Sequence, residues 1–223
     1  AIPVGACKTV LPSVLDNVGE NTLVFDVGST KASLCKTIAS HKRRAQFLAA
    51  HPIAGTEFSG PIAAVQNLFE YKTNILCESN KTNAKLLEKA VTLFTKLGMR
   101  LSYMDPIEHD RHIAYVSHLS HISSFMLGKT VIEKEKDERN IFDMAGSGFE
   151  STVRLAKSSP AMWTPIFEEN KENVVESLKE YIANLEAFKT WVENDDFQKV
   201  YESMANTNHI KNILNGITSK NNQ

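Results

Sequence analysis

The sequence lacks an excess of charge of either sign, because 25 lysines and arginines are balanced by 26 aspartates and glutamates, for a net charge of −1. Without a basic surface, the chain carries no electrostatic footprint for nucleic acid or for an anionic membrane. It also has no apolar run close to the roughly 20 residues of a membrane-spanning helix, and no signal-peptide pattern at its start. We therefore expect no nucleic-acid partner and no membrane.

Cysteine and metal-binding patterns are scarce as well. Cys7, Cys35 and Cys77 lie far apart without a C-x-x-C pair, which favours free thiols in a reducing compartment and hence a cytoplasmic protein. Two H-x-x-H pairs, at 109–112 and 118–121, have no carboxylate or thiolate at ligand spacing, and there is no H-E-x-x-H motif. We expect no metal.

The hydrophobic pattern changes near residue 105. Before it, β-rich runs alternate with helical stretches, which predicts an α/β domain with a mostly parallel sheet flanked by helices. We expect strands at 22–27, 46–50, 73–77 and 100–104, helices at 8–15, 31–39 and 86–97, and a helix-ending glycine at 98. After residue 105 only helical periodicity is sustained. The expected fold class is α/β then all-α, a truncated Rossmann-type domain at 1–104 followed by a helical domain at 105–223.

Three further segments carry expectations about packing. The opening AIPVG has no methionine and is typical of the last turn of a buried strand, so we expect a fragment of a longer chain. The segment 107–127 is expected to be a largely buried helix, and the charge run 129–139 a solvated helix end or loop. A long apolar stripe is expected on a helix at Val174, Leu178, Tyr181, Ile182, Leu185, Phe188 and Val192.

The ten residues HPIAGTEFSG at 51–60 carry the densest chemistry. They follow the apolar run 47–50, so we expect His51 at a strand end, on the sheet edge where open α/β folds bind ligands. A histidine base, glycines and a carboxylate at Glu57 suit a proton-transfer site that excludes water. Alternatively, His51 only caps the strand, the glycines allow turns, and Glu57 is a solvated charge.

Two other polar segments are expected near that edge. Ser29, in the strand-to-helix turn DVGSTK, offers an N-cap and a hydroxyl, and it should face the same edge as His51. Ser117 and His121 share a helix face with Asp110 and Ala114, at spacings of four, three and four residues, with His118 next to it. This polar face either forms interhelical hydrogen bonds or lines a cleft for a polar ligand.

Arg154 and Trp163 have ordinary alternatives as well. A guanidinium binds both oxygens of a carboxylate, which suits an acidic substrate, but a surface arginine paired with an acid is the simpler interpretation. Trp163 either packs in the core or forms one wall of a site.

Taken together, these segments resemble the prephenate/arogenate dehydrogenase family. The matching pieces are DVGSTK at 26–31, HPIAGTEFSG at 51–60, HD at 109–110, SHLSH at 117–121, GSGF at 146–149, RLAKS at 154–158, MW at 162–163 and IFEENKEN at 166–173. The resemblance implies a nicotinamide-binding α/β domain joined to a helical dimerisation domain. It also implies oxidative decarboxylation of prephenate to 4-hydroxyphenylpyruvate, with hydride transfer to NAD(P)⁺, in tyrosine biosynthesis.

The resemblance further implies roles for single residues. His51 would take the proton of the ring hydroxyl as the C4 hydride departs, and Ser29 would orient that hydroxyl and the nicotinamide. Arg154 would bind a substrate carboxylate. The other implied site residues are Ser117 and His121 for polar groups of the substrate, Glu57 at the mouth, Trp163 at the wall, and Pro3, Ser29 and Thr56 for the cofactor.

The chain departs from the family pattern in two places. The G-x-G-x-x-G turn that binds pyrophosphate is absent, together with the residue that distinguishes NAD from NADP, so we expect NAD with NADP left open and poor activity of this piece alone. Ser120 stands where proline is frequent, which we expect to be neutral. A homodimer is implied, and tyrosine is a candidate feedback ligand. An arogenate dehydrogenase and a non-catalytic dimerising or ligand-binding module remain alternatives.

Overall fold

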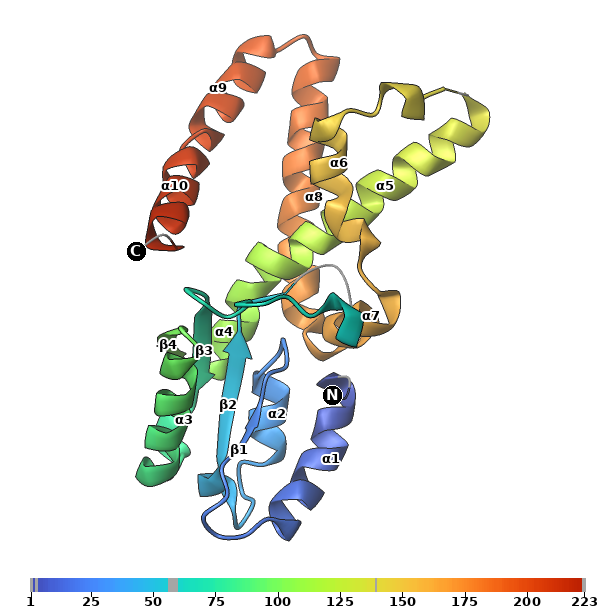
Figure 1. Ribbon diagram of the computed structural model, residues 1–223. Coiled ribbons are helices and arrows are strands. Elements are labelled where there is room, and N and C mark those ends of the chain that lie inside the picture. Colours follow the sequence, from blue (N-terminus) through green and yellow to red (C-terminus); the bar gives the residue numbers. More distant parts are fainter. Residues whose placement is uncertain (1, 3, 56–59, 139, 222–223) are drawn as a thin grey trace. The chain divides into compact units, whose positions relative to one another are not determined.

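A computed structural model describes residues 2, 4–55, 60–138 and 140–221 (Figure 1). Its contacts divide the chain into two compact units, residues 1–174 and 175–223. Each unit is described by itself. The first unit holds a sheet, the helices on its two faces and a second group of helices, and the second unit is helical.

The sheet has four strands in the order β1–β2–β3–β4. Their bounds are Val24–Asp26, Phe47–Pro52, Thr73–Cys77 and Arg100–Met104. β1 pairs with β2 and β3 with β4 in parallel, whereas β2 and β3 are antiparallel, with His51 opposite Ile75. The expected mostly parallel sheet is therefore confirmed, with an antiparallel pairing at its centre. In the described part of the connection between β2 and β3 there is a 3₁₀ turn, Pro61–Ala63, in place of the α-helical crossover that a parallel pair needs.

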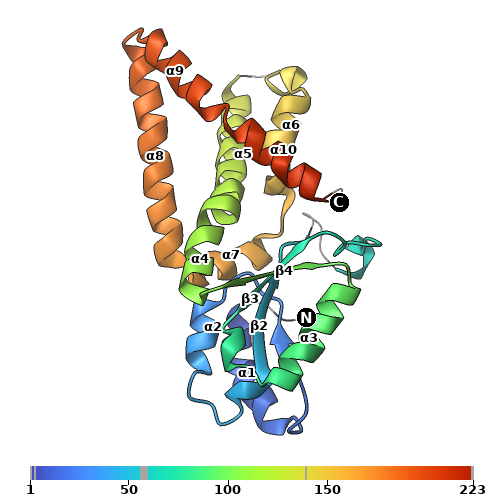
Figure 2. The ribbon, with the colours of Figure 1, turned by 90° about the vertical axis from the view of Figure 1, so that its left-hand side faces the viewer.

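Helices cover both faces of the sheet (Figure 2). α1 (Val4–Asn17) and α2 (Ala32–Thr37) pack on one face, and α3 (Ala84–Lys96) packs on the other. Side chains of β2 alternate between them, because Phe47 and Ala49 join the α1–α2 core whereas Leu48 and Ala50 join the α3 core. The same alternation places the side chain of His51 on the face of the sheet that α1 and α2 cover.

Most predicted element positions in this region are confirmed. β3 and β4 have the expected bounds, and α3 is followed by Gly98 at a φ of 75°, the left-handed conformation in which glycine ends a helix. The opening is different from the prediction. Val4 and Gly5 begin α1 rather than end a strand, and α1 buries Leu11 and Leu15 against the sheet.

The cysteines are free thiols, as predicted. Cys35 and Cys77 are buried in the α1–α2 core, and this burial raises the pKa of each thiol to about 12. A thiol with so high a pKa is protonated at neutral pH and a poor nucleophile. These two residues therefore act as small apolar side chains.

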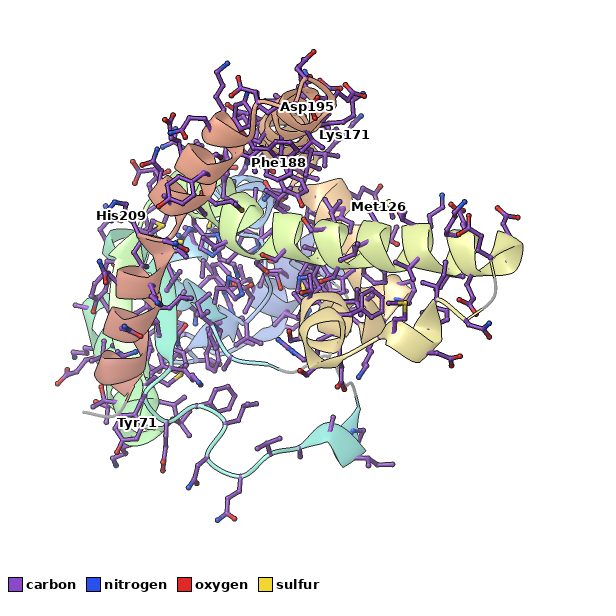
Figure 3. All side chains as sticks on the ribbon, turned by 90° about the horizontal axis from the view of Figure 1, so that it is seen from above. Tyr71, Met126, Lys171, Phe188, Asp195 and His209 are labelled. Carbon is purple, nitrogen blue, oxygen red and sulfur yellow. The ribbon has the colours of Figure 1, made fainter. Side chains whose placement is uncertain are left out.

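One long helical run follows the sheet. It comprises α4 (Pro106–Ile113), a π-helical turn (Ala114–His118) and α5 (Leu119–Asp137), so the predicted helix is confirmed and extends into the charge run. The predicted burial of its apolar side chains holds only in part, because Ile113 and Ala114 are buried whereas others are exposed. Val116 is 73% exposed, and Met126 projects from α5 (Figure 3), whereas the buried positions include His109, Asp110 and His118. The side of this run that faces the interior of the first unit therefore carries both polar and apolar residues.

Shorter elements complete the first unit. These are α6 (Ser147–Val153), α7 (Pro160–Glu169), and 3₁₀ turns at Arg44–Gln46, Ser79–Lys81, Phe142–Met144 and Arg154–Lys157. α6 packs on α5 through the hydroxyl of Ser124, which donates to the carbonyl of Thr152 at 2.6 Å. The turn at 154–157 also contacts α5, so the backbone of Arg154 belongs to a turn that packs on that helix.

The second unit contains most of α8 (Lys171–Glu193), with α9 (Phe197–Thr207) and α10 (Ile210–Asn221). The predicted helix with an apolar stripe is confirmed as α8. Many of its large apolar side chains are exposed, and α9 and α10 add more: Ile182, Leu185, Phe188, Val192, Tyr201, Met204, Ile213 and Leu214. In the part of the chain that the structure describes, we find no helix of the length and apolarity that spanning a membrane requires.

Candidate active site

His51 lies near the end of β2 and is joined to α4 by a hydrogen bond between two imidazole rings. Its Nδ1 is 2.8 Å from Nε2 of His109, and the ring planes meet at 66°. The other nitrogen of His109, Nδ1, lies 2.8 Å from Oδ1 of Asp110. Asp110, His109 and His51 thus form a line of three hydrogen-bonding side chains. The described contacts of His51 use Nδ1, so Nε2 is the atom available to a ligand.

Asp110 also fixes the start of α2. Its Oδ1 accepts the backbone N–H of Lys31, and its Oδ2 accepts that of Ala32, each at 2.8 Å. α2 has no cap from its own Lys31 side chain, so a carboxylate 79 residues further along the chain performs the capping. This contact fastens α4 to the segment that follows β1, which carries Ser29.

A buried ion pair joins the carboxyl ends of β1 and β2. The side chain of Lys31 is fully buried, and its Nζ donates to the carboxylate of Asp26 and, at 2.8 Å, to the carbonyl of Ala50. Asp26 also accepts the backbone N–H of Gly28 at 2.9 Å. Since Ala50 directly precedes His51, this pair fixes the Ser29 segment relative to the histidine, as expected for a buried charge that has several partners.

A second group of side chains surrounds His118. Nδ2 of Asn170 is 2.6 Å from the carbonyl of Asp110 and 3.2 Å from Nδ1 of His118. The ring of His118 is fully buried and meets Trp163 edge to face, at 5.9 Å between centroids. Nε2 of His118 and Nε1 of Trp163 are buried without a partner among the described residues. Asn170 therefore links the Asp110 group to an aromatic cluster.

The π-helical turn explains why His118, rather than Ser117, lies in line with Asp110. A π turn inserts about one extra residue, which rotates everything after it by about 100° relative to an uninterrupted α-helix. Spacing of an ordinary helix places Ser117 and His121 over Asp110. The observed run buries His118 and leaves Ser117 and His121 half-buried. The predicted face therefore contains a π-helical turn, and its second half, Ser117 and His121, is less buried than Asp110 and Ala114.

His121, Trp163 and Arg154 do come together, as part of the same cluster. The ring of His121 stacks on Trp163 with centroids 3.5 Å apart, and its Nδ1 bonds the backbone carbonyl of Ser117 at 2.9 Å. Arg154 is exposed, but it is close enough to lower the pKa of His121. His121 and Trp163 thus present stacked imidazole and indole rings near a guanidinium.

Three histidines in these groups, His51, His118 and His121, are biased toward the neutral form. Burial lowers the pKa of His51 well below its usual range, and the neighbouring His109, Lys31 and His118 act in the same direction. Burial lowers the pKa of His118 to about 4, against an opposing effect of Asp110. Burial also lowers the pKa of His121. Neutral imidazoles can accept a proton or hydrogen-bond at neutral pH.

The remaining predicted residues divide into two sets. Ser29 is half-buried in the segment between β1 and α2. Pro3, Thr56 and Glu57 lie outside the described residues. Sequence reasoning overlooked His109, which it treated as half of a metal pair, and Asn170. Both residues lie in motifs of the sequence, His109 in HD at 109–110 and Asn170 in EENKEN at 168–173. Neither motif reveals which side chains these residues contact in the fold.

Within the described ranges, no three or more histidine, cysteine or acidic side chains gather as a set of ligands. His109 is instead engaged with His51 and Asp110, and His112 of the same H-x-x-H pair is exposed. The two histidines of this H-x-x-H pair therefore do not share a ligand position.

Comparison with known proteins places the chain. The family model "Prephenate dehydrogenase, nucleotide-binding domain" matches residues 1–103, and "Prephenate dehydrogenase, dimerization domain" matches residues 105–206. Prephenate dehydrogenase of Bacillus subtilis is 31% identical over 187 residues, which are 80% of this chain and 48% of that protein. Cyclohexadienyl dehydrogenase of Zymomonas mobilis is 29% identical over 196 residues, 87% of this chain and 67% of that protein. The chain thus spans about half the length of the Bacillus relative.

A solved structure agrees with these matches. Prephenate dehydrogenase of Aquifex aeolicus, in complex with hydroxyphenyl propionate and NAD⁺, superimposes with a TM-score of 0.85 at 32% sequence identity. The alignment covers 95% of this chain and 73% of that one. Since both parts of the sequence match the same family and the fold agrees at this level of identity, the chain belongs to the prephenate dehydrogenase family.

Proposed function

We propose that the protein to which this chain belongs converts prephenate to 4-hydroxyphenylpyruvate, with loss of CO₂ and hydride transfer to NAD⁺. The observation that carries this proposal is His51, a buried imidazole at the end of β2 whose Nδ1 is held by His109 and whose Nε2 remains for a ligand. The Aquifex relative was solved with NAD⁺ and a hydroxyphenyl acid. NADP in place of NAD, and arogenate in place of prephenate, are the variants of this proposal.

The residues present fit the nicotinamide end of such a cofactor. β1 and β2 are parallel and end at the same edge, where the turn after β1 is tightly packed. A Cβ added at Gly28 would come within 3.2 Å of Asp26 Oδ2 and of Val4 Cγ2. Beyond this turn lies half-buried Ser29, whose side chain carries a hydroxyl. We propose that Ser29 contacts the cofactor, together with Pro3 and Thr56.

The reaction requires few protein groups, because aromatisation of the ring provides the thermodynamic drive. When bound, the nicotinamide accepts the hydride from C4. His51 takes the proton of the ring hydroxyl at Nε2, a role that its lowered pKa permits because the ring is neutral before the step. Ser29 orients the hydroxyl, and the buried ion pair of Lys31 and Asp26 holds the two residues in place.

The helical cluster would bind the rest of the substrate. We assign a substrate carboxylate to Arg154, because its guanidinium is exposed beside the stacked rings of His121 and Trp163. Ser117 and His121 would hydrogen-bond polar groups, Trp163 would form a wall, and Glu57 would act at the mouth. The division into a nucleotide-binding part at 1–104 and a helical part at 105–223 belongs to the same proposal.

A homodimer is proposed from the second unit. α8 and α9 carry exposed apolar side chains that a second copy would cover, and the matching family model is described as a dimerization domain. Sedimentation showing a monomer would contradict this. A cytoplasmic location and tyrosine as a feedback ligand complete the proposal. Tyrosine titration against prephenate turnover tests the second.

The central test is His51→Asn in the full protein. We expect turnover of prephenate with NAD⁺ to fall by about 10³-fold, because the proton acceptor is lost, while substrate binding changes little. The matched control is His112→Asn, an exposed histidine of α4, which should leave turnover unchanged. Undiminished turnover in His51→Asn would overturn the assignment. Competition of prephenate with arogenate at limiting concentration distinguishes the two substrates, and ligand binding without turnover in the unaltered protein would favour a non-catalytic module.

A further inference from the structure

Both carboxylate oxygens of Asp110 accept hydrogen bonds from the backbone at the start of α2. Oδ1 accepts the backbone N–H of Lys31 and Oδ2 accepts that of Ala32. A backbone N–H can only donate, so neither oxygen is free to act as a donor in this geometry. Any further partner of Oδ1 must therefore bring its own hydrogen.

This requirement determines where the hydrogens lie on the two imidazoles. Nδ1 of His109, at 2.8 Å from Oδ1 of Asp110, must carry a hydrogen, which leaves a lone pair on Nε2 of the neutral ring. That nitrogen lies 2.8 Å from Nδ1 of His51, which in turn must be the donor. The hydrogen of neutral His51 is then on Nδ1, and the lone pair is on Nε2.

We propose that His109 is a positioning residue that holds His51 in the tautomer a base requires, with Asp110 fixing His109 in its turn. In water, a neutral histidine side chain prefers the opposite tautomer, with hydrogen on Nε2. The hydrogen bond made by one ring nitrogen decides which nitrogen is protonated. Without His109, the atom aimed at a ligand would carry a hydrogen and could not accept another.

The same line of side chains stabilises the charge that His51 acquires in the reaction. As the substrate O–H bond breaks and an Nε2–H bond forms, the ring becomes an imidazolium. Its Nδ1–H donates to His109, and Nδ1–H of His109 donates to the carboxylate of Asp110. A buried carboxylate behind an imidazole is a known means of orienting a base and stabilising its charged form. This half of the inference rests on the proposed function, whereas the tautomer does not.

A test must separate hydrogen bonding from packing, because His109 is only 1% exposed. His109→Phe keeps a ring of similar size but cannot accept a hydrogen bond. In His109→Gln, the amide oxygen can reach the position of Nε2 and accept the hydrogen of His51 Nδ1. Thermal unfolding of both variants shows that each is folded under the conditions of measurement.

The decisive measurement is the tautomer of His51 by long-range ¹H–¹⁵N NMR of ¹⁵N-histidine-labelled full-length protein. The His51 signals are assigned by their loss in His51→Asn. We expect Nε2 of the unaltered protein to be unprotonated, the Phe variant to change to the Nε2–H form, and the Gln variant to retain Nδ1–H. Hydrogen on Nε2 in the unaltered protein, or no change in the Phe variant, would overturn the proposal.

Kinetics then tests the charge-stabilising role. His109→Phe should lower kcat for prephenate by roughly 10- to 100-fold with little change in KM for NAD⁺, and His109→Gln should recover most of the loss. Equal kcat in all three proteins, despite a changed tautomer, overturns this role. If the unaltered protein shows the expected tautomer but no turnover, the proposed function fails and the assignment of His109 stands.

Discussion

The two histidine groups of the first unit are built in opposite ways. His51 and His109 are linked to Asp110 through hydrogen bonds, and Asp110 accepts two further backbone hydrogens. The group around His118 is held mainly by ring contacts, and it contains buried nitrogens with no partner among the described residues. The first group is therefore fixed in its hydrogen-bond geometry, whereas the second presents ring surfaces and buried nitrogens that still lack a partner among the described residues.

Among substitutions in the two groups, Asp110→Ala should cause the largest loss of stability. The variant removes a helix cap and leaves the buried donors of Lys31 and His109 and the partly buried donor of Ala32 without an acceptor, so we expect a loss of about 3 kcal/mol in the free energy of unfolding. Urea denaturation measures it. The matched control is Asp105→Ala, which removes an exposed cap of α4 and should cost about 1 kcal/mol. Equal losses would show that the Asp110 group is an ordinary cap.

A smaller effect should appear in the pH dependence of stability. The pKa of His118 is about 4 in the folded chain and near 6.5 when unfolded, so the unfolded state binds more protons in between. The contribution of neutral His118 to the free energy of unfolding is fully present above the pKa of the unfolded state, and it is lost as pH falls from about 6.5 to about 4. Since burial also lowers the pKa values of His51 and His121, they add to the same slope.

His118→Phe isolates the contribution of the aromatic group. It keeps the ring contacts with Trp163 and Phe167 but has no titrating nitrogen, so the slope of unfolding free energy against pH should decrease in this window. Denaturation series at several pH values, with His112→Phe as the exposed control, measure it. An unaltered slope in His118→Phe would mean that other groups dominate the acid response.

The smallest effect should come from Trp163→Phe. The shorter ring loses part of its stack on His121, and it removes the unpartnered Nε1, so a net loss of about 1 kcal/mol is expected from thermal unfolding. KM for prephenate should rise while kcat changes little, because this ring provides shape rather than proton transfer. A kcat reduced as strongly as in His51→Asn would remove the functional distinction between the two groups.

Local signals in the sequence were sufficient to predict most elements and the place of His51 near a strand end. β-rich runs predicted β3 and β4 with their observed bounds, and the apolar run before His51 placed it at the end of β2. The family motifs also pointed to the right class of protein, since their combination is specific even though each piece is short. Such features depend on a few neighbouring residues, which is why one sequence suffices.

Tertiary relations were the part that could not be predicted. The His51–His109 bond joins residues 58 apart, and the Asp110 cap joins residues 79 apart. The direction of β3 depends on how the chain returns after β2, which strand propensity does not encode. The opening AIPVG is apolar enough for a strand, yet Val4 starts a helix because Leu11 and Leu15 can pack on the sheet.

The π-helical turn limits how many residues this helical run can gain or lose. Asp110 and His118 share Asn170 because five residues, Ala114–His118, occupy a wider turn. Deleting one of them would restore an ordinary helix and rotate all of α5 by about 100° relative to α4. Substitutions within the turn can be conservative, but its residue count cannot vary, so insertions and deletions here should be far more harmful than point changes.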